Sequence, residues 1–289
     1  MAIKNNSISK KVALLLFTIF FLIGVITFKD YGITIDEEFH RSNGFYWLNY
    51  VLSFTPFHEL NSTVAFKMAQ IKGFTLPSPV DEPYYGVVFD LPAAFLEVIF
   101  KIDDSKNYFY FKHFLNFLLF FTASIFFYKL LLNRFTNYSV ALVGTLFFVL
   151  SPRIYGNSFF NMKDIISLSL LTIALYYCFK LFDKINYKNF LIFSIFAALS
   201  TSQRMYGIFL PLSFIIFYLL SVLSKKKILN DLPGIIFFCI SFLVFLTIFW
   251  PYLWSNPVEN FLLTFKQMSH HYFYEKFQIL FDGVYVPAN

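Results

Sequence analysis

Charged residues are scarce in this sequence. Asp, Glu, Lys and Arg make up 14% of the 289 residues, whereas soluble domains carry about 25%. Hydrophobic residues reach 58% and the mean hydropathy is +0.62. The shortage of charge, together with several long apolar runs, excludes an ordinary soluble domain and predicts an integral membrane protein.

Cysteine is also rare, and several familiar motifs are missing. Cys178 and Cys239 both lie in apolar runs without a CxxC partner, so neither a disulfide framework nor a cysteine metal site is indicated. There is no Walker P-loop, dinucleotide fingerprint, HExxH or GxSxG motif. The net charge of +6 fits the positive-inside rule better than nucleic-acid binding, so no nucleic-acid partner is expected.

Apolar segments are abundant. They predict an all-α integral membrane protein, a polytopic bundle of about seven transmembrane helices in a single domain over residues 1–289. The segments are residues 11–28, 110–132, 138–151, 164–182, 187–203, 205–223 and 232–250.

The distribution of Lys and Arg predicts the topology. A cytoplasmic N-terminus, with residues 11–28 as a retained signal anchor in the inner (cytoplasmic) membrane, places most basic flanks inside, including Lys225–Lys227. The long first loop, residues 29–109, then lies on the extracytoplasmic side. A tail with no further helix, residues 251–289, follows the last span on the same side, and we expect the protein to continue into a missing C-terminal part.

The first loop contains two amphipathic, aromatic stretches, residues 45–54 and 87–96. Such stretches are typical of helices that lie in the membrane interface. The alternative is a loop packed on the helix bundle.

Four polar features fall on the predicted outer face. An acidic pair, Asp36-Glu37, follows the first apolar segment, and Gln203-Arg204 separates the fifth from the sixth. The loop at residues 151–164 contains Arg153, Lys163 and Asp164. An aromatic stretch after the last span leads to His270-His271.

These residue types suit transfer from a phosphate carrier. A base must take the proton of the acceptor hydroxyl, which a carboxylate such as Asp36 can do. Cations must hold the departing phosphate, and Arg153, Lys163 and Arg204 supply three. No cofactor is required by the sequence, although a divalent metal bridging Asp36, Asp164 and the phosphate is possible chemistry.

Each feature also has a simpler interpretation. The acidic pair can cap a helix, and Lys163 can form an ion pair with Asp164. Arg204 can extend to the interface. The His270-His271 pair is best interpreted as solvated. His113 starts the second apolar segment on the predicted outer face, where it can contact either the site or only the lipid headgroups.

The ordered set of motifs resembles a known superfamily. The stretches that carry the resemblance are residues 30–37 (DYGITIDE), 85–92 (YGVVFDLP), 151–155 (SPRIY) with 160–164 (FNMKD), and 249–254 (FWPYLW). They are similar to motifs of the GT-C membrane glycosyltransferases, in particular the bacterial relatives of the protein O-mannosyltransferases.

The resemblance implies a fold and roles for single residues. The first outer loop would fold into interfacial helices and carry the base, Asp36, with Glu37 beside it. Asp164 would be the second acidic residue of the site. Arg153, Lys163 and Arg204 would hold the carrier phosphate. Full-length members have more spans and often a C-terminal soluble domain.

The sequence therefore predicts an inverting hexosyltransferase. It would move a sugar from a polyprenyl-phosphate donor to a lipid, glycan or protein acceptor at the outer face of the membrane. Two alternatives remain: a transporter or flippase of an anionic lipid-linked substrate, and a ligase or polymerase of surface polysaccharide.

Overall fold

The computed structural model describes residues 7–71, 83–223, 232–269, 278–281 and 284–287. The chain divides into two compact units, Met1–Pro251 and Tyr252–Asn289. The second unit contains α12 (Pro257–Ser269) and an antiparallel hairpin of β1 (Gln278–Phe281) and β2 (Val284–Pro287). Helix α12 corrects the expectation of a tail without a further helix.

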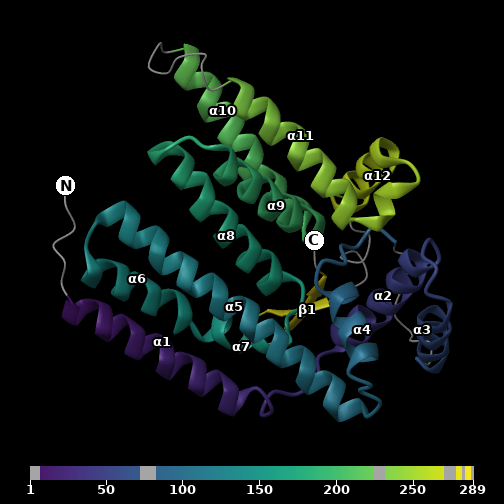
Figure 1. Cartoon of the computed structure of the whole chain (residues 1–289). Coiled ribbons are helices and arrows are strands. Elements are labelled where there is room, and N and C mark those ends of the chain that lie inside the picture. Colours follow the sequence, from purple (N-terminus) through teal and green to yellow (C-terminus); the bar gives the residue numbers. More distant parts are fainter. Residues whose placement is uncertain (1–6, 72–82, 224–231, 270–277, 282–283, 288–289) are drawn as a thin grey trace. The chain divides into compact units, whose positions relative to one another are not determined.

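The first unit is helical (Figure 1). Its α-helices are α1 (Ser7–Thr27), α2 (Ile35–Leu52), α3 (His58–Gln70), α4 (Asp90–Ile99), α5 (Ser105–Phe135), α6 (Tyr138–Val149), α7 (Pro152–Phe160), α8 (Asp164–Asp183), α9 (Tyr187–Gln203), α10 (Phe209–Leu223) and α11 (Leu232–Phe249). A 3₁₀ turn, η1 (Met205–Ile208), joins α9 to α10, and another, η3 (Pro251–Trp254), spans the boundary between the units.

All seven predicted apolar segments are largely helical. By length and composition, however, fewer than seven of the described helices qualify as membrane spans. Four described helices are long and apolar enough to cross a membrane, namely α1, α5, α8 and α11. A fifth span results if α6 and α7, which are bent by 61°, count as one. Helices α9 and α10 have 17 and 15 residues, short of the roughly 20 that a span requires.

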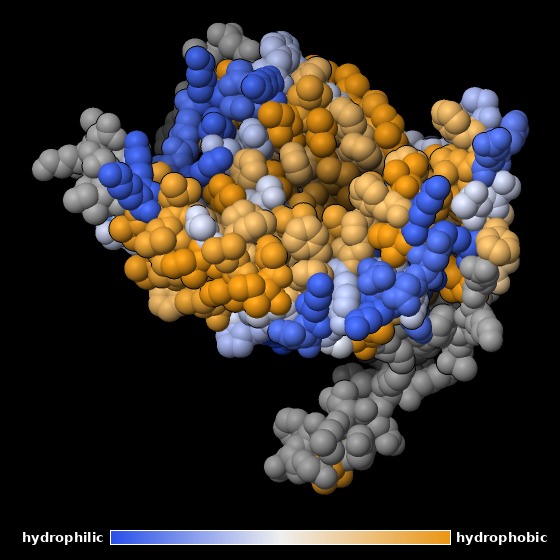
Figure 2. Space-filling view, turned by 60° about the horizontal axis from the view of Figure 1, so that its bottom comes forward, coloured by the Kyte–Doolittle hydropathy of each residue, from blue (hydrophilic) through white to orange (hydrophobic). Residues whose placement is uncertain are grey.

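Broad apolar surfaces cover the described helices. Figure 2 shows orange, hydrophobic side chains over wide areas, with hydrophilic side chains gathered in separate groups. On α1 and α11 large side chains such as Leu14 and Leu243 are exposed. Surfaces of this extent are costly in water and suit contact with lipid. The chain is a multi-pass membrane protein.

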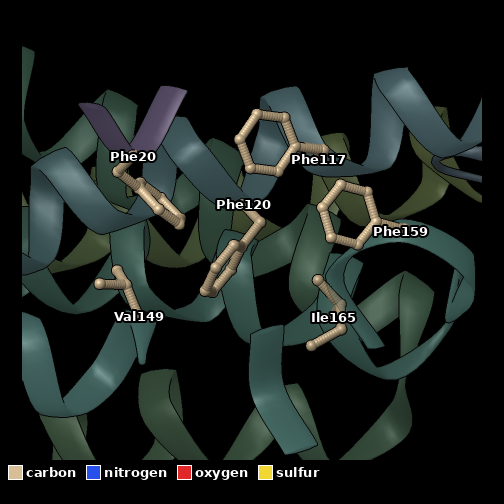
Figure 3. Packing of buried hydrophobic residues seen from close by; sticks show 6 residues of the cluster. All are labelled: Phe20, Phe117, Phe120, Val149, Phe159 and Ile165. Carbon is tan, nitrogen blue, oxygen red and sulfur yellow. The ribbon is translucent and has the colours of Figure 1, made fainter. Parts of the chain in front are cut away.

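Aromatic packing joins α1, α5 and α7. Phe117 of α5 and Phe159 of α7 are buried with their rings stacked 5.3 Å apart (Figure 3). Phe20 of α1 packs edge-on against Phe117 at 5.6 Å. Gly24 allows this approach, because a Cβ there would overlap the Phe117 ring. Truncating a buried Phe typically costs about 3–5 kcal/mol, so this cluster fixes the helices that precede and follow the first loop.

The first loop contains three helices rather than the two predicted. Helix α2 contains the predicted stretch 45–54 up to Leu52, and α4 contains the stretch 87–96 from Asp90 onward, whereas α3 was not predicted. Phe45, Leu48 and Val64 are buried in one cluster with Ala94 and Val98 of α4. Gly44 brings α2 and α4 together, since a Cβ there would overlap the Asp90 carbonyl. The interfacial position of these helices stays a prediction.

A second contact links α4 to the loop before α8. Phe89 and Ala93 are buried against Met162, Ile166 and Leu170. Because Met162 directly precedes Lys163, this packing brings the start of α4 beside the predicted phosphate-binding residues. The predicted irregular loop 151–164 is corrected as well, since most of it forms α7.

Candidate active site

The first turn of α2 carries the acidic pair, and its two carboxylates have different surroundings. Thr34 is extended and caps the helix, and the acids Asp36, Glu37 and Glu38 occupy the first turn, where the helix dipole favours negative charge. Glu37 is fully buried. Its Oε1 accepts hydrogen bonds from the Thr34 amide at 2.7 Å and the Thr34 hydroxyl at 3.2 Å. The capping interpretation is therefore confirmed for Glu37.

Glu37 also binds α5. Its Oε2 lies 2.8 Å from Nε2 of His113, which is likewise buried, and the other ring nitrogen of His113 lies 3.4 Å from the Phe28 carbonyl oxygen. A carboxylate that is buried away from solvent needs such hydrogen-bond partners to offset the cost of its desolvation. The pair anchors the first turn of α2 to α5.

Asp36, one residue earlier, is exposed. Within the described parts of the chain its carboxylate makes no hydrogen bond or ion pair. It is accessible to a substrate, while its helical turn is held rigidly by Glu37 and His113. This combination suits a base whose position must be fixed but whose oxygen atoms must be free.

The loop before α8 is ordered by Asn161. Its Oδ1 accepts hydrogen bonds from the Lys163 amide at 3.2 Å and the Asp164 amide at 2.8 Å. Its Nδ2 donates to Asp164 Oδ2 at 3.2 Å. These bonds fix the turn that places Lys163 at the N-cap of α8 and Asp164 at its first residue.

Asp164 forms an ion pair with Arg204, not with Lys163. Its Oδ1 accepts from Nε of Arg204 at 3.0 Å and from Nη2 at 2.6 Å. Arg204 follows the last residue of α9, and Gln203 fixes that end by donating to the Met162 carbonyl at 3.1 Å. The expected Lys163–Asp164 ion pair does not occur in the described chain, because Arg204 binds the carboxylate instead.

Lys163 lies among these groups. Its ammonium sits 3.6 Å from the centre of the Tyr85 ring, a cation–π arrangement. Burial and the nearby Arg204 lower the pKa of Lys163 to about 8. Three carboxylates act in the opposite direction, namely Asp36, Asp164 and Asp90. Asp36 of the first loop therefore lies within electrostatic range of Lys163, and the two segments contribute to one candidate site.

Close backbone contact supports this arrangement. Gly86 lies against the end of α9, and a Cβ at this position would overlap the Ser202 carbonyl oxygen. Tyr85 and Arg204 are therefore held close together by adjacent backbone segments. Only glycine allows such an approach.

Arg153 is placed apart from these contacts. It lies near the start of α7 and is exposed, and its carbonyl accepts a hydrogen bond from Asn157 at 2.7 Å. Its guanidinium forms no hydrogen bond or ion pair with any described residue. The structure thus gathers Asp36, Lys163, Asp164 and Arg204, and leaves the predicted phosphate contact of Arg153 without geometric support.

A buried polar cluster behind the site was missed by sequence reasoning. His40 Nδ1 lies 2.8 Å from Asp90 Oδ2, and Asn43 Nδ2 donates to the same oxygen at 3.1 Å. Arg41 binds Glu97 with two hydrogen bonds of 2.6 and 3.2 Å. The signal was present: Glu37, His40 and Arg41 are spaced three and four residues apart, on one face of a helix.

No group of three or more His, Cys, Asp or Glu side chains in the described residues is arranged to hold a metal ion. Asp164, one of the two carboxylates expected to share a metal, forms an ion pair with Arg204. A metal bridged by Asp36, Asp164 and the phosphate stays a prediction, and the mechanism below uses none. His270-His271 and Lys225–Lys227 lie outside the described residues.

The fold and site define a multi-pass membrane protein in which an exposed carboxylate and two cations belong to one candidate site. Residues 91–254, more than half of the chain, match the family described as dolichyl-phosphate-mannose-protein mannosyltransferase. The chain belongs to this family. Membership supports a glycosyltransferase of the GT-C type that uses a lipid-linked sugar donor.

Lys163, Asp164 and Arg204 fall within the matched residues, and Asp36 precedes them. No curated protein and no solved structure matches the chain.

Proposed function

We propose that the protein transfers a hexose from a polyprenyl-phosphate donor to an acceptor hydroxyl at the outer face of the cytoplasmic membrane. The observation that carries this proposal is the convergence of Asp36, Lys163 and Arg204. They come from three segments far apart in the chain, and Lys163 responds electrostatically to the other two. One exposed carboxylate beside two cations is the minimum that the reaction needs.

The reaction inverts the anomeric centre. The acceptor oxygen attacks C1 of the sugar and forms the new C1–O bond, while the bond from C1 to the phosphate oxygen breaks. Asp36 takes the hydroxyl proton, and the polyprenyl phosphate leaves with the electron pair of the broken bond. A well-placed base of this kind contributes roughly 10²–10⁴-fold to the rate.

Lys163 and Arg204 stabilise the departing phosphate. The Lys163 side chain is partly buried, which strengthens its attraction to an anion. Arg204 is partly exposed and binds Asp164 with two N–H groups, so Asp164 orients the guanidinium for a phosphate. Arg153 is the third proposed cation, contributing from α7 as the donor headgroup enters.

Product analysis tests the proposal. The protein, reconstituted in liposomes, is given a panel of polyprenyl-phosphate hexoses and candidate lipid, glycan and protein acceptors. The expected result is a glycosidic product of inverted configuration together with free polyprenyl phosphate. Movement of the intact donor between leaflets with no new glycosidic bond would overturn the proposal in favour of a flippase. A lengthened polysaccharide as the product would indicate a polymerase or ligase.

A further inference from the structure

A cavity of about 590 Å³ lies in the first unit, away from the candidate site. Its lining residues include Leu130 of α5, Phe182 of α8, Phe190 of α9, Phe214 of α10 and Ile235 of α11. The candidate site is at the start of α8 and the end of α9, whereas the cavity is at the end of α8 and the start of α9. Helix α8 has 20 residues and therefore spans about 30 Å, the thickness of a bilayer's hydrocarbon core.

The cavity is enclosed on one side and open on the other. Phe190 and Phe214 are 1% and 5% exposed and form its closed wall. Phe179, Phe182 and Phe217 are 39%, 50% and 62% exposed and form its open edge. An apolar cavity of this volume with an open side is suited to an apolar ligand that enters from the membrane.

The polar residues of the cavity gather at the helix ends. Asn133 donates to Asp183 at 2.6 Å, which engages that carboxylate. Arg134, in the last turn of α5, also lines the cavity, and its guanidinium has no hydrogen-bond or ion-pair partner in the described chain. Lys180 and Lys184 flank the same end of α8, so positive charge predominates there.

We propose that this cavity binds an anionic phospholipid. One acyl chain lies between the phenylalanine rings, and the phosphate receives hydrogen bonds from Arg134. The apolar walls suit an acyl chain, and Arg134, the cation that lines the cavity among the described residues, suits an anionic headgroup. Both meet at the level where a lipid presents chain and phosphate together. The site is separate from the candidate active site, and the proposal does not depend on the transferase reaction.

Photo-crosslinking tests this site. The full chain is placed in nanodiscs that contain phosphatidylglycerol with a photoreactive group on the acyl chain, and the labelled peptides are mapped by mass spectrometry. Labelling is expected to concentrate on the peptides that contain Phe179, Phe182 and Phe217. Phosphatidylcholine with the same chain should label them several-fold less.

Two exposed cations provide matched variants. Arg134→Gln is expected to lower labelling by phosphatidylglycerol about tenfold, the effect of one charge-assisted hydrogen bond. Lys184→Gln removes the same charge from the same end but does not line the cavity, and should leave labelling nearly unchanged. Equal effects of the two variants, equal labelling by both lipids, or labelling spread evenly over the apolar faces of α1 and α11 would overturn the proposal.

Discussion

The two neighbouring acids divide the work of the candidate site. Glu37 is buried and bound on both oxygens, by Thr34 and by His113. Asp36 is exposed one residue away. A helix turns about 100° per residue, so adjacent carboxylates necessarily face different surroundings. Glu37 fixes the helix, and Asp36 remains accessible for the proposed role as base.

Lys163 is expected to give the proposed reaction a pH dependence. In the proposed mechanism its ammonium form holds the phosphate. Burial lowers its pKa to about 8, so the charged fraction of the free enzyme falls as the pH rises through 8. We expect kcat/KM for the donor to decrease above about this pH. Lys163→Arg stays charged and should move the decrease to higher pH, as measured by donor titrations at several pH values. Identical profiles for both proteins would contradict the role of Lys163.

His113 is expected to contribute to the stability of the folded protein. In His113→Ala the Glu37 carboxylate keeps Thr34 but loses its partner on α5, and an unsatisfied buried acceptor costs about 1–3 kcal/mol. We expect a lower Tm in detergent for this variant. His58→Ala, at the exposed start of α3, is the control and should unfold like the wild type. Equal Tm values for both variants would show that the pair does not anchor α2.

At the scale of elements, the apolar runs predicted the long helices, whereas the helices of mixed polar sequence were not predicted. Residues 187–203 were predicted to their ends, because an apolar run between Asn186 and Arg204 has clear boundaries. Helices α3, α7 and α12 were missed, since their mixed polar sequences resemble loops. The sequence also named Asp36, Lys163, Asp164 and Arg204 together.

Pairing among those residues was beyond sequence reasoning. Lys163 and Asp164 are adjacent in the chain, which suggested an ion pair between them as the simpler alternative. Adjacent residues on a helix do not face each other, and Arg204, the residue after α9, binds Asp164 instead. The buried pair of His40 and Asp90 was also missed. The two residues are 50 positions apart in the chain, and the sequence does not show which distant residues meet.

The close approach at Gly86 provides a test at this scale. In Gly86→Ala the new Cβ would overlap the Ser202 carbonyl oxygen. Neither atom can move away by a side-chain rotation, so the backbone must shift, at a cost of about 1–3 kcal/mol. We expect lower stability and lower activity, since the shift displaces Tyr85 and Arg204.

Gly156→Ala is the matched control. No atom lies within 4 Å of a Cβ at this position in α7, and alanine favours helices by up to about 1 kcal/mol. This variant should unfold at or above the wild-type temperature, as measured by thermal unfolding in detergent. A Gly86→Ala protein that matched it in stability and turnover would show that the contact does not support the site.

At the scale of the whole molecule, the account depends on which side of the membrane each helix end faces. We expect Gly32, beside the acidic pair, to lie outside and Lys184, at the end of α8, to lie inside. With Cys178 and Cys239 replaced by alanine, an impermeant maleimide should label Gly32→Cys in intact cells and Lys184→Cys only after permeabilisation. Labelling of both positions in intact cells, or the reverse pattern, would contradict the predicted topology.

The central claim is that Asp36 acts as the base beside Lys163 and Arg204. The most direct test is the turnover of Asp36→Asn at saturating donor and acceptor, with Asp30→Asn as the control because Asp30 is an exposed acid of the same loop. We predict that kcat falls roughly 10²–10⁴-fold for Asp36→Asn, while Asp30→Asn keeps the wild-type rate. Wild-type turnover in Asp36→Asn would contradict the claim.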